Sequence, residues 1–113
     1  MNLLKTVESL ENNAAEFGFR WKTSAQIMDQ IQSECVEISE HLKEDQNNRE
    51  ALQEEIGDLL HAAFSLCVFC EFSPEETLKK TLSKFNRRLN MVKTIAHEKA
   101  QSYGSCHKGP PHH

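Results

Sequence analysis

The sequence predicts an all-α fold, with a four-helix bundle-like protomer that oligomerises through its helices. Apolar residues recur at helical spacing in four segments of the 113-residue chain. Polar or glycine-containing breaks separate these segments, and no strand pattern competes with them. The length allows one small domain. We expect this domain over residues 1–101, followed by a disordered tail over residues 102–113 that contains Gly, Pro and His without apolar periodicity.

The first two helices are expected before residue 44. Residues 2–16 carry apolar side chains at helical spacing, and the Phe-Gly-Phe sequence at 17–19 breaks that helix. Thr23 or Ser24 caps the second helix, which should run to about Lys43. The polar run at 44–48 is the natural turn after it. The buried side of the second helix is expected to consist of Ile27, Ile31, Ile38 and Leu42.

The third helix should run from about Asn48 to Cys70. It becomes almost wholly apolar after Asp58, which implies a half that is buried on most sides. Ser73 then caps a fourth helix that has Pro74 at its first position and acidic residues in its first turn. This helix should extend to about residue 100. Its apolar stripe consists of Leu78, Leu82, Phe85, Leu89, Val92 and Ala96.

Charge and composition limit the classes of partner. The net charge of -4 argues against a nucleic-acid polymer as the main partner. No run approaches the roughly 20 apolar residues that a membrane span requires, and the first residues lack the features of a signal peptide. We therefore expect a cytoplasmic protein that does not enter a membrane. Four cysteines fit this interpretation; Cys67 and Cys70 lie in an apolar stretch that favours packing, with a zinc or redox CxxC site as the alternative.

Two acidic pairs interrupt the apolar pattern of neighbouring helices. Glu34 and Glu37 lie three residues apart on the second helix, and Glu55 and Asp58 do so on the third. Residues three apart share one face of a helix, so each pair directs two carboxylates the same way. An antiparallel pairing of the two helices would bring all four carboxylates together.

Four carboxylates at the edge of a core need compensation. Two like charges about 4 Å apart repel by about 4 kcal/mol at an effective dielectric constant near 20. Oxygen ligands without Cys or His favour Mg²⁺, or Mn²⁺ as a substitute, and Mg²⁺ in proteins commonly binds substrate phosphates as well. The pattern alone leaves two interpretations open, a divalent-cation site for phosphate chemistry and a solvated acidic face.

Other side chains have both a functional and a structural interpretation. Lys84, Arg87 and Arg88 share a face of the fourth helix, where they could bind phosphate oxygens or form a solvated face. Trp21, the only tryptophan, could stack on a nucleobase or close the core. His41 and His61 lie close in sequence to the acidic pairs. Each could be a metal ligand, a proton shuttle or a surface residue. The tail histidines His107, His112 and His113 could bind a metal only adventitiously.

The order of these motifs resembles that of the MazG-like nucleoside triphosphate pyrophosphohydrolases. The resemblance covers about residues 21–92. It rests on Glu34-x-x-Glu37, on EEIGDLL at residues 54–60, on SPEE at 73–76 and on KFNRRL at 84–89. It implies an all-α fold in which Glu34, Glu37, Glu55 and Asp58 hold Mg²⁺ and act in catalysis.

The resemblance also implies a reaction and partners. A metal-activated water would attack the α phosphorus of a nucleoside triphosphate and release a nucleoside monophosphate and pyrophosphate. Lys84, Arg87 and Arg88 would contact phosphates, and Trp21 would lie near the nucleotide. The protein would form a homodimer or homotetramer. Substrates would be dNTPs or non-standard NTPs, with dUTP, dCTP or phosphoribosyl-ATP as specialised alternatives.

The chain departs from the family pattern at two positions. Ser33 precedes Glu34 where many relatives have a further acid, and Lys22 stands where many have Asp. The general base is therefore unassigned, with Glu54 as a candidate. A helical interaction module without catalytic activity is the alternative from another functional class.

Overall fold

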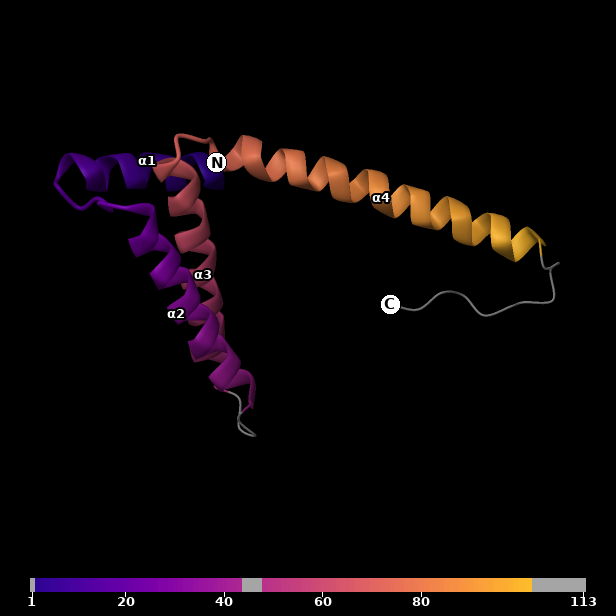
Figure 1. The fold of residues 1–113 in the computed structure, drawn as a ribbon, viewed down its shortest axis with the longest axis horizontal. Coiled ribbons are helices and arrows are strands. Elements are labelled where there is room, and N and C mark those ends of the chain that lie inside the picture. Colours follow the sequence, from indigo (N-terminus) through magenta and orange to yellow (C-terminus); the bar gives the residue numbers. More distant parts are fainter. Residues whose placement is uncertain (1, 44–47, 103–113) are drawn as a thin grey trace. The chain divides into compact units, whose positions relative to one another are not determined.

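The protein is described by a computed structural model that covers residues 2–43 and 48–102. These residues form four helices and no strand, which confirms the predicted all-α fold (Figure 1). Bundle packing of all four helices and association of protomers stay predictions. The turn at 44–47 and the tail at 103–113, with Cys106 and the tail histidines, lie outside the described residues. The helices are α1 (Leu3–Glu16), α2 (Ser24–Lys43), α3 (Arg49–Phe69) and α4 (Pro74–Ser102).

Local sequence signals explain where the helices begin. Asn2 and Asn48 accept hydrogen bonds from backbone N–H groups in the first turns of α1 and α3. Thr23 Oγ1 accepts from the Gln26 N–H, and Ser73 Oγ accepts from the Glu76 N–H, so both predicted caps are present. Each cap satisfies a donor that has no partner inside the helix, which contributes about 1 kcal/mol.

The chain divides into two compact units, residues 1–77 and 78–113. In the first unit α2 and α3 pack side by side, and α1 packs against α3 (Figure 1). The core is small, with Ile27 of α2 fully buried and with Leu52 and Ala62 of α3 also buried. Pro74, the first residue of α4, is also buried in this unit.

Helices α1 and α3 end with the same backbone motif. The N–H of Phe19 donates to the carbonyl of Ala14 at 2.8 Å, and the N–H of Phe72 donates to that of Cys67 at 2.8 Å. A hydrogen bond between residues five positions apart at a helix end requires the residue before the donor to adopt a left-handed backbone conformation. In α1 that residue is Gly18, with φ of 91°, whereas in α3 it is Glu71, with φ of 66°.

Some expected burial is absent. Leu42 is 62% exposed, so its placement on the buried side of α2 was wrong. It lies in the last turn of α2, and α3 begins only at Arg49, so little of α3 is available to cover it. Ile31 and Ile38 are half-buried, and Leu60 of the apolar half of α3 is exposed.

Taken one at a time, the described helices are too short or too polar to cross a membrane. Only the pair 49–69 and 74–101, counted together across a bend, meets the criteria of length and composition.

Candidate active site

Three carboxylates come together where α2 and α3 pack. Glu34 and Glu37 project from α2 and Glu55 from α3, and one oxygen of each lies within 4.8 Å of the others. The antiparallel pairing predicted from the sequence therefore brings members of both acidic pairs into one group. Glu34 is buried, Glu55 is half-buried and Glu37 is exposed, so the cluster opens to solvent on one side.

Glu34 is the buried member of this acidic cluster. Its side chain is 5% exposed, and its Oε2 accepts a hydrogen bond of 2.6 Å from Nε2 of Gln30, one turn earlier on α2. Its Oε1 is buried without a hydrogen-bond partner among the described residues. Burial raises the pKa of the Glu34 carboxyl above its ordinary value, and the charges of Glu37 and Asp58 raise it further. The protein thus holds an incompletely satisfied carboxylate at this position.

Glu37 shows the same electrostatic conflict across the helix pair. The close contact of its carboxyl with that of Glu55 raises the pKa of Glu37, and the negative charge of Glu55 acts in the same direction. Like charges this close favour either a shared proton or a bound cation.

Asp58 lies outside this group of three. It lines a cavity together with Glu34, and we call this space the acidic cavity. The cavity has a volume of about 270 Å³ and lies between α2, α3 and the segment before α2. Glu34 and Asp58 both line it, so two acidic residues border this space. The other lining residues are Trp21, Gln30, His61, Ala62 and Ser65.

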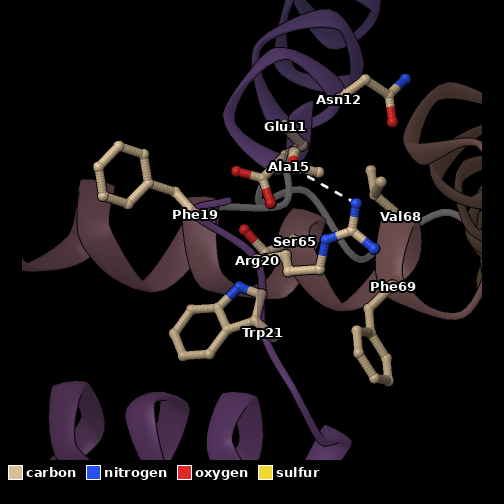
Figure 2. A pocket seen from close by; sticks show the side chains of 9 residues that line it. All are labelled: Glu11, Asn12, Ala15, Phe19, Arg20, Trp21, Ser65, Val68 and Phe69. Carbon is tan, nitrogen blue, oxygen red and sulfur yellow. Dashed lines mark hydrogen bonds between the residues drawn. The ribbon is translucent and has the colours of Figure 1, made fainter. Parts of the chain in front are cut away.

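A second cavity of about 310 Å³ shares Trp21 and Ser65 with the first. Figure 2 shows the side chains around it, which come from α1, from the α1–α2 connection and from α3. The Arg20 guanidinium donates to the Ala15 carbonyl at 3.3 Å within it. Because the two cavities have common walls, one elongated ligand could occupy both. The remaining residues of this second cavity are Glu11, Asn12, Phe19, Val68 and Phe69.

A contact between α1 and α3 links the walls of the two cavities. Nε2 of His61, which lines the acidic cavity, lies 2.9 Å from Oε2 of Glu11, which lines the second cavity. His61 is thus a cavity residue, and Trp21 is half-buried in the wall that both cavities share.

The predicted cationic residues and Glu54 are exposed. Lys84, Arg87 and Arg88 are exposed on α4, in the second unit, and their role in phosphate binding stays a prediction. Glu54 is exposed and lines a different hollow with Glu50 and Gln53, so it does not border the acidic cavity.

Among residues 2–43 and 48–102, no group of three or more potential metal-binding side chains includes a cysteine. Cys67 and Cys70 have free thiols, half-buried and exposed respectively.

Sequence reasoning missed Gln30, Glu11 and Ser65. Gln30 precedes Glu34 by four residues, a spacing that places the two on one helix face and could have indicated the contact. Glu11 belongs to an acid pair that resembles any solvated helix face, and Ser65 is a lone hydroxyl in an apolar stretch. Neither carries a local signal, because Glu11 reaches the second cavity through the packing of α1 on α3, and Ser65 lies in the wall of both cavities through the packing of α3 against its neighbours.

The donor set fits a hard divalent cation. The cluster offers carboxylate oxygens without Cys or His, as Mg²⁺ and Mn²⁺ prefer, and the buried Oε1 of Glu34 has no hydrogen-bond partner within residues 2–43 and 48–102. The fold and the site thus define an all-α domain with a candidate cation site beside a cavity that Glu34 and Asp58 line.

Comparison with known proteins agrees with this description. Residues 22–93 match the family described as the MazG nucleotide pyrophosphohydrolase domain, and the chain belongs to this family. It is 34% identical over 92 residues to a nucleoside triphosphate pyrophosphohydrolase/pyrophosphatase MazG of Thermotoga maritima, covering 81% of this chain and 34% of that protein. It is 29% identical over 92 residues to a nucleoside triphosphate pyrophosphohydrolase of Escherichia coli K12, covering 81% and 35%. The chain therefore spans about a third of the length of these curated relatives.

Proposed function

We propose that the chain hydrolyses nucleoside triphosphates, dNTPs or non-standard NTPs, between the α and β phosphates in a Mg²⁺-dependent reaction. The observation that carries this proposal is the group formed by Glu34, Glu37 and Glu55 within 4.8 Å, with a buried Glu34 oxygen that has no hydrogen-bond partner in the described part of the chain. Membership of the MazG family supports the same reaction class. The proposed setting is the cytoplasm, as the sequence led us to expect.

The acidic residues would hold the cation. Glu34, Glu37 and Glu55 provide the clustered oxygens, and Asp58 provides a further carboxylate at the cavity wall. When bound, Mg²⁺, or Mn²⁺ in its place, lowers the pKa of a coordinated water and offsets negative charge on the phosphates. Gln30 would fix the orientation of the Glu34 carboxylate through its 2.6 Å hydrogen bond.

The proposed chemistry is an attack of water on phosphorus. The water oxygen forms a bond to the α phosphorus, the bond from that phosphorus to the bridging oxygen breaks, and pyrophosphate leaves. The proton of the water passes to a base that we leave unassigned. The triphosphate would occupy the cavity lined by Glu34 and Asp58, and the nucleoside would extend past Trp21 into the second cavity.

The fourth helix would add cationic groups and an association surface. Lys84, Arg87 and Arg88 are proposed to bind phosphates, across a subunit boundary where protomers associate. A homodimer or homotetramer would cover the apolar side chains that α4 exposes. These include Leu82 at 54%, Phe85 at 61% and Val92 at 62% exposure.

The alternatives concern substrate and class. An enzyme specialised for dUTP, dCTP or phosphoribosyl-ATP would use the same acidic cluster, so a panel of nucleotides separates these possibilities. A helical interaction module without activity would leave the acidic residues as a solvated face. It predicts no stabilisation of the fold by divalent cations.

Thermal unfolding tests the proposal directly. The midpoint is measured with EDTA, with Mg²⁺, and with Mg²⁺ plus a non-hydrolysable dNTP analogue, for the wild type, Glu55→Gln and Glu40→Gln. Glu40 is an exposed acid of α2 outside the cluster, so its variant is the matched control. A ligand at a hundred times its dissociation constant adds about 2.7 kcal/mol of stability, which shifts the midpoint by several degrees.

We expect the Mg²⁺ shift in the wild type and the control but not in Glu55→Gln. Release of pyrophosphate, measured on the same three proteins, should follow the same order. A folded wild type with no shift at saturating Mg²⁺ and nucleotide would overturn the proposal in favour of the interaction module.

A further inference from the structure

We propose that Glu11, held in place by His61, recognises an exocyclic amino group of the nucleobase and so disfavours uracil and thymine nucleotides. This inference rests on the proposed function, because it assigns the second cavity to the nucleoside of the same substrate. It names a specificity-determining residue on α1.

Glu11 occupies the position that such a role requires. Its side chain is 18% exposed and lines the second cavity, which Trp21 shares with the acidic cavity. In Figure 2 the Glu11 carboxylate and the Trp21 indole come from different elements and border the same hollow. An aromatic face binds any base by stacking, without reading its edge. Discrimination between bases therefore depends on the polar groups beside the indole.

The contact with His61 holds the Glu11 carboxylate in place. One oxygen, Oε2, lies 2.9 Å from Nε2 of His61, a side chain that is itself 63% exposed on α3. A carboxylate has two oxygens and about four acceptor sites, so acceptor capacity remains for a ligand in the cavity.

The chemistry of a carboxylate decides which base it accepts. It can only accept hydrogen bonds when ionised, so it pairs with the amino group of cytosine, adenine or guanine. Uracil and thymine present a carbonyl oxygen where cytosine has its amino group, and two acceptors facing each other are unfavourable. A buried polar group left without its partner rejects the wrong substrate more strongly than an apolar pocket does.

The decisive comparison is dCTP against dUTP, which differ at this edge of the same ring. We expect the wild type to show a kcat/KM ratio for dCTP over dUTP of about 10 or more, because a hydrogen bond to a charged group contributes about 1.5–3 kcal/mol. Glu11→Gln supplies an amide N–H that can donate to the uracil carbonyl, so the ratio should fall toward one. Glu16→Gln is the matched control, since Glu16 is an exposed acid of α1 that does not line the cavity.

His61 is a positioning residue in this scheme, and a second set of variants tests it. His61→Ala should lower the dCTP to dUTP ratio, and His61→Gln, which keeps a donor toward Glu11, should restore part of it. If His61 has a purely structural role, its removal should lower kcat/KM for dCTP and for dUTP by the same factor, so the ratio should not change.

Each outcome bears on a different claim. Hydrolysis of dCTP and dUTP with equal kcat/KM, or a preference unchanged in Glu11→Gln, would overturn this inference and leave the proposed function standing. If the folded protein neither binds nor hydrolyses any nucleotide in the presence of Mg²⁺, both this inference and the proposed function would be overturned. A ratio that falls in Glu11→Gln but not in Glu16→Gln would establish the role of Glu11.

Discussion

Gln30 Nε2 donates a hydrogen bond of 2.6 Å to one oxygen of Glu34, whose other oxygen is buried without a hydrogen-bond partner among the described residues. Both residues lie on α2, four positions apart, so their contact does not require another helix. It orients the Glu34 carboxylate, and in the proposed cation site Gln30 would therefore support the acidic residues.

The first prediction concerns this positioning contact. Gln30→Ala leaves the acidic side chains intact but removes the amide donor that hydrogen-bonds Glu34. We expect apparent Mg²⁺ affinity to fall about 10–100-fold, as is typical when a residue supporting a metal ligand is removed. Isothermal titration with Mg²⁺ measures it. Gln32→Ala, an exposed neighbour on α2, is the control, and equal affinities in both variants would contradict the prediction.

The second prediction concerns pH. The folded-state pKa of Glu34 and Glu37 lies above the ordinary value of 4.5, because of burial for Glu34 and contact with Glu55 for Glu37. Between 4.5 and the raised pKa the folded state binds more protons than the unfolded state. The contribution of these groups to stability is therefore present below pH 4.5 and is lost as pH rises through the raised values.

This dependence can be isolated by chemical denaturation in EDTA at a series of pH values. Glu34→Gln removes the buried charge, so it should lose less stability than the wild type between pH 4.5 and neutrality. Added Mg²⁺ should reverse the fall in the wild type, since the cation binds the ionised carboxylates. Parallel stability curves for the wild type and Glu34→Gln would count against the assignment.

The third prediction concerns the left-handed residues that end α1 and α3. Glu71 has φ of 66°, a conformation that costs a residue with a side chain about 1–2 kcal/mol. Glu71→Gly should therefore raise the free energy of unfolding by about 1 kcal/mol. Gly18→Ala should lower it by a similar amount, although an added methyl group would meet no atom within 4 Å.

Gly57→Ala provides the control for these glycine changes. Gly57 lies inside α3 with open space around it, so alanine there should stabilise the helix by about 1 kcal/mol. Urea denaturation of the three variants measures the differences. A loss of stability in Gly57→Ala together with a gain in Gly18→Ala would show that backbone conformation does not govern these positions.

The fourth prediction concerns the apolar stripe of α4. Phe85 is 61% exposed, and Leu82 and Leu89 lie one turn to either side of it. If protomers associate through this stripe, Phe85→Glu should shift the mass in solution toward the monomer. Light scattering coupled to size-exclusion chromatography measures the mass. Ser83→Glu adds a charge off the stripe and should leave the mass unchanged, whereas a monomeric wild type would remove this basis for association.

Much of the fold was predictable from the sequence because its signals are local. Helices begin directly after Thr23, Asn48 and Ser73, and each of these residues follows a break in the helical pattern of apolar residues. Gly18 marks the end of α1. The end of α3 carries no such mark, since Glu71 adopts a conformation that glycine usually supplies. That conformation is imposed by the backbone bonds around it.

The site was predictable only in part. The pairing of Glu34 and Glu37 with Glu55 follows from two spacings and an antiparallel turn, all of which are visible in the sequence. The unequal burial of the three carboxylates depends on the packing of α2 against α3, which no spacing encodes. The contact of Glu11 with His61 depends on the packing of α1 against α3, and helix periodicity does not determine that packing.

The shared wall of the two cavities has a practical consequence. Trp21 is the only tryptophan in the sequence, and it borders both spaces. Its fluorescence therefore comes from the candidate site alone, without background from other indoles. A nucleotide that stacks on this ring should quench the emission, so the protein carries its own optical reporter for ligand screening, and no label needs to be attached near the acidic cluster.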